Sequence, residues 1–156
     1  MVDTGRFNAV RRPLDGPQNA KTIQLYDYWR ALSADAPFPP RAALDAMAVR
    51  TLLGNIMLVD VIGPPLDFRY RLIGEDIIRF NGRSLKGRTV LELLRDDPNQ
   101  QGVFDNYAKV AGSAWPSYTA VSYENVQGVI KNSESCVLPL GEPPVVSTLL
   151  VGLVFL

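Results

Sequence analysis

The sequence contains no histidine and only one cysteine, Cys136. Without histidine there is no Ser-His-Asp catalysis, no histidine-ligated haem or zinc, and no phosphotransfer through an imidazole. A single cysteine excludes an internal disulfide and every metal site built from several thiolates. Acid–base chemistry would rest on Asp, Glu, Lys, Tyr or the lone thiol. We therefore expect no catalytic residue and no metal site.

The sequence also lacks an excess of charge and a long apolar run. Sixteen basic residues balance sixteen acidic ones, whereas a nucleic-acid-binding domain usually carries a basic excess, because phosphate contacts supply much of its affinity. The N-terminus shows no apolar run of signal-peptide length. The most apolar segment, residues 145–156, has twelve residues, and a membrane-spanning helix needs about twenty. These absences predict a cytoplasmic protein that binds neither nucleic acid nor membrane.

Residues 1–54 are predicted to precede the main domain. Residues 1–21 contain Gly, Pro, Asn and Arg without apolar periodicity, which indicates a flexible leader. Residues 22–54 are predicted to be a helical extension, in which a proline-rich segment at 36–40 separates two helices. In the first helix, four apolar side chains lie at positions i, i+3, i+4 and i+7, on one stripe: Leu25, Tyr28, Trp29 and Leu32.

This apolar stripe needs a surface to pack against, and two surfaces are available. The helix either packs on the sheet of its own chain or contacts a second copy or another protein. Because Trp and Tyr are enriched at interface hot spots, we expect a homodimer through this helix.

Residues 55–156 are predicted to form one domain. The apolar, β-branched segment 56–62 indicates a buried strand, and the alternation of apolar residues with arginines in 68–73 indicates an antiparallel one. Short helices separated by glycines follow between residues 74 and 112, and three strands are predicted at 117–123, 129–140 and 145–156. This order predicts an α+β fold, a five-stranded antiparallel sheet with helices packed on one face.

Several short motifs resemble those of small, single-domain bacterial PAS proteins. Residues 71–74 (Arg-Leu-Ile-Gly) end a strand and lead into a helix, and residues 82–87 (Gly-Arg-Ser-Leu-Lys-Gly) match a following turn. A helix bearing Trp29 precedes the domain, and residues 138–140 (Leu-Pro-Leu) match the end of the penultimate strand. The resemblance covers residues 25–156. It implies a non-enzymatic sensor or regulator in signal transduction, which binds a small ligand, a separate signalling protein, or both.

The resemblance does not identify a cofactor, because PAS domains bind flavin, haem, small metabolites or nothing. Haem-binding members generally use an axial histidine, which is missing here. A photoreactive flavin domain needs a reactive cysteine in a helix beside the ring, whereas Cys136 lies in a predicted strand. Haem and photoreactive flavin are therefore disfavoured, and the cofactor stays open.

A ligand in a PAS-like fold would lie between the inner face of the sheet and the short helices of residues 75–94. The candidate pocket residues are Tyr70, Leu72, Ile77, Phe80, Phe104, Tyr107, Tyr118 and Tyr123. Ordinary core packing is the alternative for each, although a buried tyrosine hydroxyl needs a polar partner and favours a site. Two other functions stay open: a ligand-free interaction scaffold, and a small cone-shaped α+β enzyme such as an isomerase using Asp and Tyr.

Overall fold

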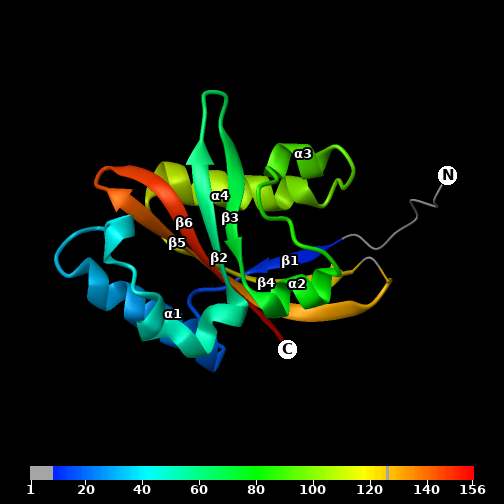
Figure 1. Ribbon diagram of the computed structural model, residues 1–156, viewed down its shortest axis with the longest axis horizontal. Helices are drawn as coiled ribbons and strands as arrows, with labels where there is room; N and C mark the ends of the chain where they lie inside the picture. Colours follow the sequence, from blue (N-terminus) through cyan, green and yellow to red (C-terminus); the bar gives the residue numbers. More distant parts are fainter. Residues whose placement is uncertain (1–8, 126) are drawn as a thin grey trace.

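Six antiparallel strands form the central sheet of this computed structural model, which describes residues 9–125 and 127–156 (Figure 1). Their order across the sheet is β1-β4-β5-β6-β2-β3. The strands are β1 (Val10–Pro13), β2 (Ile56–Ile62), β3 (Asp67–Ile73), β4 (Ser117–Glu124), β5 (Ile130–Glu142) and β6 (Val145–Phe155). The antiparallel sheet with helices confirms the predicted α+β class.

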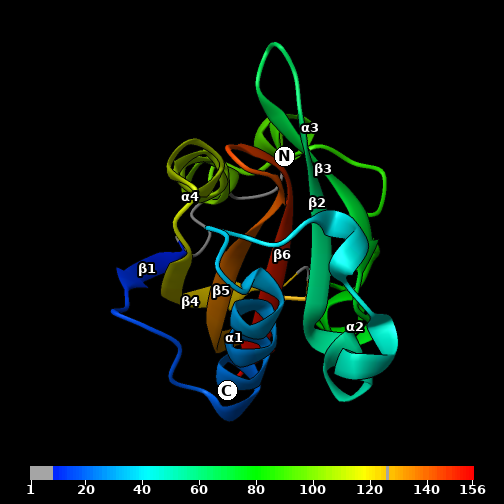
Figure 2. The ribbon, with the colours of Figure 1, turned by 90° about the vertical axis from the view of Figure 1, so that its left-hand side faces the viewer.

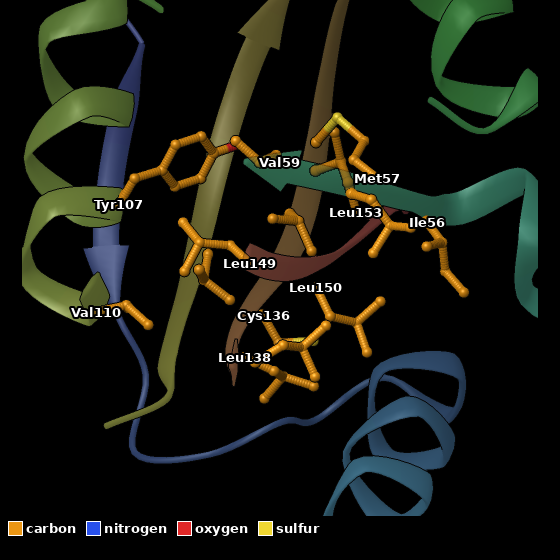
Figure 3. Close-up of a cluster of buried hydrophobic side chains, with 14 of the residues drawn as sticks. Ile56, Met57, Val59, Tyr107, Val110, Cys136, Leu138, Leu149, Leu150 and Leu153 are labelled. Carbon is orange, nitrogen blue, oxygen red and sulfur yellow. The ribbon is translucent and has the colours of Figure 1, made fainter. Parts of the chain in front are cut away.

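The two longest strands, β5 and β6, lie in the middle of the sheet and are buried on both faces. Successive side chains of a strand point to opposite faces. Cys136 and Leu138 therefore lie on one face (Figure 3), and Val137 between them lies on the other. Burial on both faces explains why residues 145–156 are nearly continuously apolar rather than alternating.

Helix α1 (Ala20–Ser33) covers one face of β5 and β6 (Figure 2). The side chain of Asn19 caps the helix by accepting a hydrogen bond from the backbone nitrogen of Lys21 at 2.8 Å. Leu25 and Trp29 are buried, and the indole nitrogen of Trp29 donates to the carbonyl oxygen of Pro139 at 2.9 Å. On β6, a Cβ at Gly152 would lie 2.8 Å from the Cδ2 atom of Leu25. The absence of a side chain there allows the helix to approach the strand.

The expected intermolecular role of the α1 stripe is therefore corrected for Leu25 and Trp29, which pack within their own chain. Tyr28 and Leu32 are half-buried, and the Tyr28 hydroxyl accepts a hydrogen bond from the backbone nitrogen of Asp45 at 2.8 Å. Two 3-10 segments, η1 (Arg41–Ala43) and η2 (Ala46–Asn55), then lead into β2. The homodimer itself stays a prediction.

Three further helices cover the opposite face: α2 (Glu75–Asn81), α3 (Val90–Leu94) and α4 (Gln100–Ser113). Helix α4 buries Val103, Tyr107 and Val110, which share one side because they lie three or four residues apart. Thr89 caps α3, since its side chain accepts a hydrogen bond from the backbone nitrogen of Glu92. The three helices of the domain thus lie on one face of the sheet, as predicted, and α1 of the N-terminal segment covers the other face.

Residues 10–13, expected within a flexible leader, instead form the edge strand β1, which pairs with β4 from Val10↔Ser122 to Pro13↔Thr119. This segment has no apolar alternation of its own, and its strand structure depends on pairing with a distant part of the chain. Residues 1–8 of that leader lie outside the described residues. Predicted segments 22–54 and 55–156 share one core, in which Leu25 and Trp29 join residues of β5 and β6.

No helix among the described residues is long and apolar enough to span a membrane.

Candidate functional site

A cavity of about 170 Å³ lies on the α2 and α4 side of the sheet. Strands β2, β3, β5 and β6 supply its floor, α2 and α4 its roof, and β1 and β4 one side. The apolar part of the lining comes from five elements and from the segment between α2 and α3, and it consists of Met57, Ile77, Leu85, Val103, Val137, Val151, Leu153 and Phe155. The core of this protein is thus hollow on one side of the sheet.

Two tyrosine hydroxyls meet at the cavity. Tyr70 extends from β3 and Tyr107 from α4, where Tyr107 points toward the sheet (Figure 3), and their side chains hydrogen-bond to each other. The ring of Tyr107 is also fixed by an edge contact with Phe68, at 5.5 Å between ring centroids. A third tyrosine, Tyr123 from β4, lines the same cavity.

Burial raises the pKa of Tyr70 to about 12 and that of Tyr107 well above its usual value. Removal from water disfavours the charged phenolate, and this effect outweighs the nearby positive charge of Arg11, which lowers both pKa values. Both hydroxyls therefore stay protonated at neutral pH, as hydrogen-bond donors and not as bases.

Arg11 is the cation at one side of the cavity. Strand β1 places it there, and Gly102 of α4 leaves the space that its side chain occupies: a Cβ at Gly102 would lie 2.4 Å from the Nε atom of Arg11. The Nη2 atom of Arg11 is buried and has no hydrogen-bond partner within residues 9–125 and 127–156. A buried donor without an acceptor is costly, which makes this atom a candidate for contact with a ligand.

Three other charged residues line the cavity. The carboxylate of Asp97 accepts hydrogen bonds from the backbone nitrogen of Asn99 at 3.0 Å and from the side chain of Gln100 at 3.2 Å. Asp97 is therefore engaged at the start of α4. Arg83 and Glu124 also line the cavity and are exposed. Within the described residues, no group of three or more His, Cys, Asp or Glu side chains could hold a metal ion.

Four of the predicted pocket residues line the cavity together: Tyr70, Ile77, Tyr107 and Tyr123. They come from β3, α2, α4 and β4, so the fold brings them together from the whole length of the domain. Phe80 and Phe104 do not line it. Phe80 contacts Phe155 with ring centroids 4.3 Å apart and ring planes tilted by 41°, and Phe104 packs edge-on against Phe68 at 5.3 Å. Both serve ordinary core packing.

Leu72 and Tyr118 point away from the cavity for geometric reasons. The register of β2 and β3 shifts between Leu58 and Val59, so Arg71 is an extra residue and Leu72 lies on the opposite face from Tyr70, 41% exposed. Tyr118 and Tyr123 are separated by an odd number of positions, which places them on opposite faces of β4. Tyr118 contacts Tyr26 of α1, with ring centroids 6.0 Å apart.

The sequence patterns missed several lining residues. Arg11 carried no signal, because it lies in a segment without apolar periodicity. Met57, Val137 and Val151 lie in segments predicted as buried strands, but a continuously apolar strand does not show which of its faces borders a cavity.

Cys136 lies away from the cavity, on the α1 face of β5. It pairs with Gly152 across the sheet, and its thiol is buried, which raises its pKa to about 12. A thiol in that state is a poor nucleophile at neutral pH.

A hairpin, a helical crossover and a three-stranded meander, with a small cavity between sheet and helices, define the class of this antiparallel α+β domain. A family model described as PAS domain matches residues 18–155, and the chain belongs to that family. PAS domains are sensory and regulatory modules, and this general description applies to the chain. The matched range includes α1, which agrees with the shared core.

A comparison with solved structures supports the same fold. The chain is similar to the protein in "Structure of an RNA-binding Light-Oxygen-Voltage Receptor", with a TM-score of 0.54, 15% identity, and coverage of 95% of this chain. It spans 38% of the length of that protein, and at this identity the similarity shows the fold alone. A search of curated proteins gives no match.

Proposed function

We propose that this PAS domain is a non-enzymatic sensor in signal transduction, which binds a small molecule in the cavity between the sheet and helices α2 and α4. The observation that carries the proposal is the cavity itself: about 170 Å³ between the sheet and the helices, where Arg11 and the Tyr70–Tyr107 hydroxyl pair meet apolar side chains of the sheet. An apolar cavity with a few convergent polar groups is the usual form of a small-molecule site.

The volume favours a small metabolite. An apolar cavity of about 150 Å³ holds a molecule the size of benzene, whereas sites for drug-sized ligands measure about 300–1,000 Å³. The cavity therefore matches a ligand with a body near the size of one aromatic ring.

The polar groups favour binding over catalysis. An isomerase of the kind considered above would need a buried carboxylate facing a tyrosine hydroxyl. Tyr70 and Tyr107 instead hydrogen-bond to each other, and Asp97 is held at the start of α4. Raised pKa values keep the two hydroxyls neutral, which suits hydrogen bonding to a ligand.

The central strand β5 provides a route from the cavity to the other face. Ser135 lines the cavity, and its neighbour Glu134 holds the start of α1. The Glu134 carboxylate accepts hydrogen bonds from the backbone nitrogens of Gln18 at 2.9 Å and Asn19 at 3.0 Å, and from the hydroxyl of Thr22. A ligand that binds one arrangement of β5 better than another would shift the position of α1, and a separate signalling protein would read that shift.

The test is a thermal-shift screen of small fragments against the wild type and two variants. Val137→Phe fills the cavity, whereas Val145→Phe makes the same change at an exposed site on β6. A fragment at a hundred times its Kd stabilises by about 2.7 kcal/mol, which raises Tm by roughly 5–10 °C in a domain of this size. We expect the shift in the wild type and in Val145→Phe, and none in Val137→Phe.

Native mass spectrometry of the purified protein extends this test to a ligand acquired in the cell. The proposal fails if no fragment shifts the wild type and no small molecule co-purifies, or if the shifts persist after Val137→Phe.

A further inference from the structure

Arg11 and the residues around it indicate the chemical class of the ligand. Arg11 pairs with Val121 across β1 and β4 and faces the cavity, whereas its neighbour Arg12 is exposed on the same short strand. The side chain of Arg11 lies against Gly102, so it reaches from the edge of the sheet to α4. One arginine of the pair is thus built into the site, and the other is not.

The guanidinium of Arg11 needs an acceptor. Its buried Nη2 atom has no hydrogen-bond partner in the part of the chain that the structure describes. The nearby tyrosines offer donors as well: one proton of the Tyr70–Tyr107 pair is used in the bond between them, and the other is available to a third group. A cation and a hydroxyl donor together favour a negatively charged oxygen. Arginine binds a carboxylate through two parallel hydrogen bonds.

The remainder of the lining limits the rest of the ligand. Met57, Val151 and Leu153 are buried and present apolar surface, which suits a hydrocarbon body. Asp97 and Glu124 line the same cavity, as does the exposed Arg83, so the lining carries two negative and two positive side chains. Among the described residues it is Arg11 that has a buried side-chain nitrogen without a partner, which favours a single anionic group beside it. The site therefore suits one anionic end and one apolar end.

We propose that the ligand is a small monocarboxylate with an apolar body about the size of one aromatic ring, bound through Arg11 and the Tyr70–Tyr107 pair. This inference rests on the proposed function, because it names the ligand class of the same cavity. Arg11 binds the carboxylate, and the apolar residues of the sheet pack against the body.

The experiment compares benzoate with benzamide and benzyl alcohol, which share its ring but carry no charge. Isothermal titration calorimetry is done on the wild type, Arg11→Met and Arg12→Met. Arg12→Met removes the same charge from the same strand and is the matched control. We expect benzoate to bind the wild type at least tenfold more tightly than either neutral compound, to lose at least tenfold in Arg11→Met, and to change less than twofold in Arg12→Met.

A second variant keeps the test decisive if Arg11→Met does not fold, as judged by far-UV circular dichroism. Tyr70→Phe removes one hydroxyl and keeps the ring, and we expect it to weaken benzoate about three- to tenfold while binding of the neutral compounds changes less. An unchanged benzoate affinity in Tyr70→Phe would count against the role of the tyrosine pair.

One outcome would overturn the carboxylate inference alone, and another would overturn the proposed function as well. If the neutral compounds bind as well as benzoate, and Arg11→Met binds all three like the wild type, the carboxylate inference is overturned and the cavity remains a ligand site. If no compound, charged or neutral, binds the wild type in this assay or in the fragment screen, both proposals fall.

Discussion

The two faces of strands β5 and β6 are built in opposite ways. On the α1 face, Leu25 and Trp29 fill the space above Cys136 and Leu138, and the thiol of Cys136 lies within 3.1 Å of where a side chain at Gly152 would begin. On the α4 face, the same two strands border a cavity of about 170 Å³ that also holds Arg11 and tyrosine hydroxyls.

This difference shows how one pair of strands serves two purposes. Neighbouring residues belong to different faces: Glu134 holds α1 and Ser135 lines the cavity, while Leu138 is packed against α1 and Val137 borders the empty space. The filled face supplies stability because dense packing gains both buried area and close contacts. The hollow face gives up some of that packing and leaves room for a ligand.

The substitution with the largest expected effect on stability is at Trp29, on the filled α1 face. Trp29→Ala removes a buried ring and its hydrogen bond to Pro139, and we expect the free energy of unfolding in urea to fall by about 3–5 kcal/mol. Trp115 is 75% exposed, so Trp115→Ala is the matched control, with an expected change within about 0.5 kcal/mol. Equal losses in the two variants would contradict a filled α1 face.

The attachment of α1 to β5 is tested at Glu134. Glu134→Ala leaves the backbone nitrogens of Gln18 and Asn19 without their acceptor, and we expect a loss of about 2–3 kcal/mol, because hydrogen bonds to charged groups are strong. Hydrogen exchange should show faster exchange at these two amides. Glu142→Ala, at the exposed end of the same strand, is the control. Unchanged exchange after Glu134→Ala would argue against this attachment.

The contrast between filled and hollow faces is tested by introducing phenylalanine at two adjacent positions, of which Val137 gains the greater volume. Leu138→Phe adds volume to a packed face, and we expect it to cost about 1–3 kcal/mol. Val137→Phe adds volume beside the cavity, and we expect a cost below about 1 kcal/mol. Denaturant unfolding measures both. If Val137→Phe proves the more destabilising of the two, the cavity side is as tightly packed as the α1 side.

At neutral pH the last comparison has no effect on stability, and it appears only at alkaline pH. Burial raises the pKa of Cys136 from 9.0 to about 12 and that of Tyr70 from 10.0 to about 12. Above pH 9.0 for Cys136 and pH 10.0 for Tyr70, the group has lost its proton in the unfolded chain but keeps it in the folded chain. The free energy of unfolding therefore falls as pH rises, by up to about 1.4 kcal/mol per pH unit and per group.

Cys136 lies on the α1 face and Tyr70 on the cavity face, and each begins to lower the stability at a different pH. Urea unfolding at pH 8, 9, 10 and 11 should show that Cys136→Ala reduces the loss from about pH 9, whereas Tyr70→Phe reduces it only from about pH 10. Identical pH profiles for wild type and both variants would mean that neither group is buried as described.

Elements with a strong local pattern were predicted closely. The β-branched run at 56–62 coincides with β2 (Ile56–Ile62), and the alternating run at 68–73 with β3 (Asp67–Ile73). The short strand β1 was missed, because its pairing with β4 supplies the structure and its own residues carry no period of two.

The candidate site was predicted in part, and the errors have specific causes. Tyr70 and Tyr107 were found because a buried hydroxyl in an apolar segment needs a polar partner. Leu72 was misplaced because strict alternation does not anticipate the bulge at Arg71, which moves it to the other face. Tyr118 was misplaced because the pattern of its strand did not show which face borders the cavity.

The sequence by itself determined what chemistry is possible: with no histidine and one cysteine, the available groups are the same in any fold. It also determined where most strands and helices form, because those depend on neighbours along the chain. Only the tertiary structure decided that Arg11 meets Tyr70 and Tyr107, and that one face of β5 is filled while the other is hollow. Such contacts join residues far apart in the sequence, and no local pattern specifies the volume left between them.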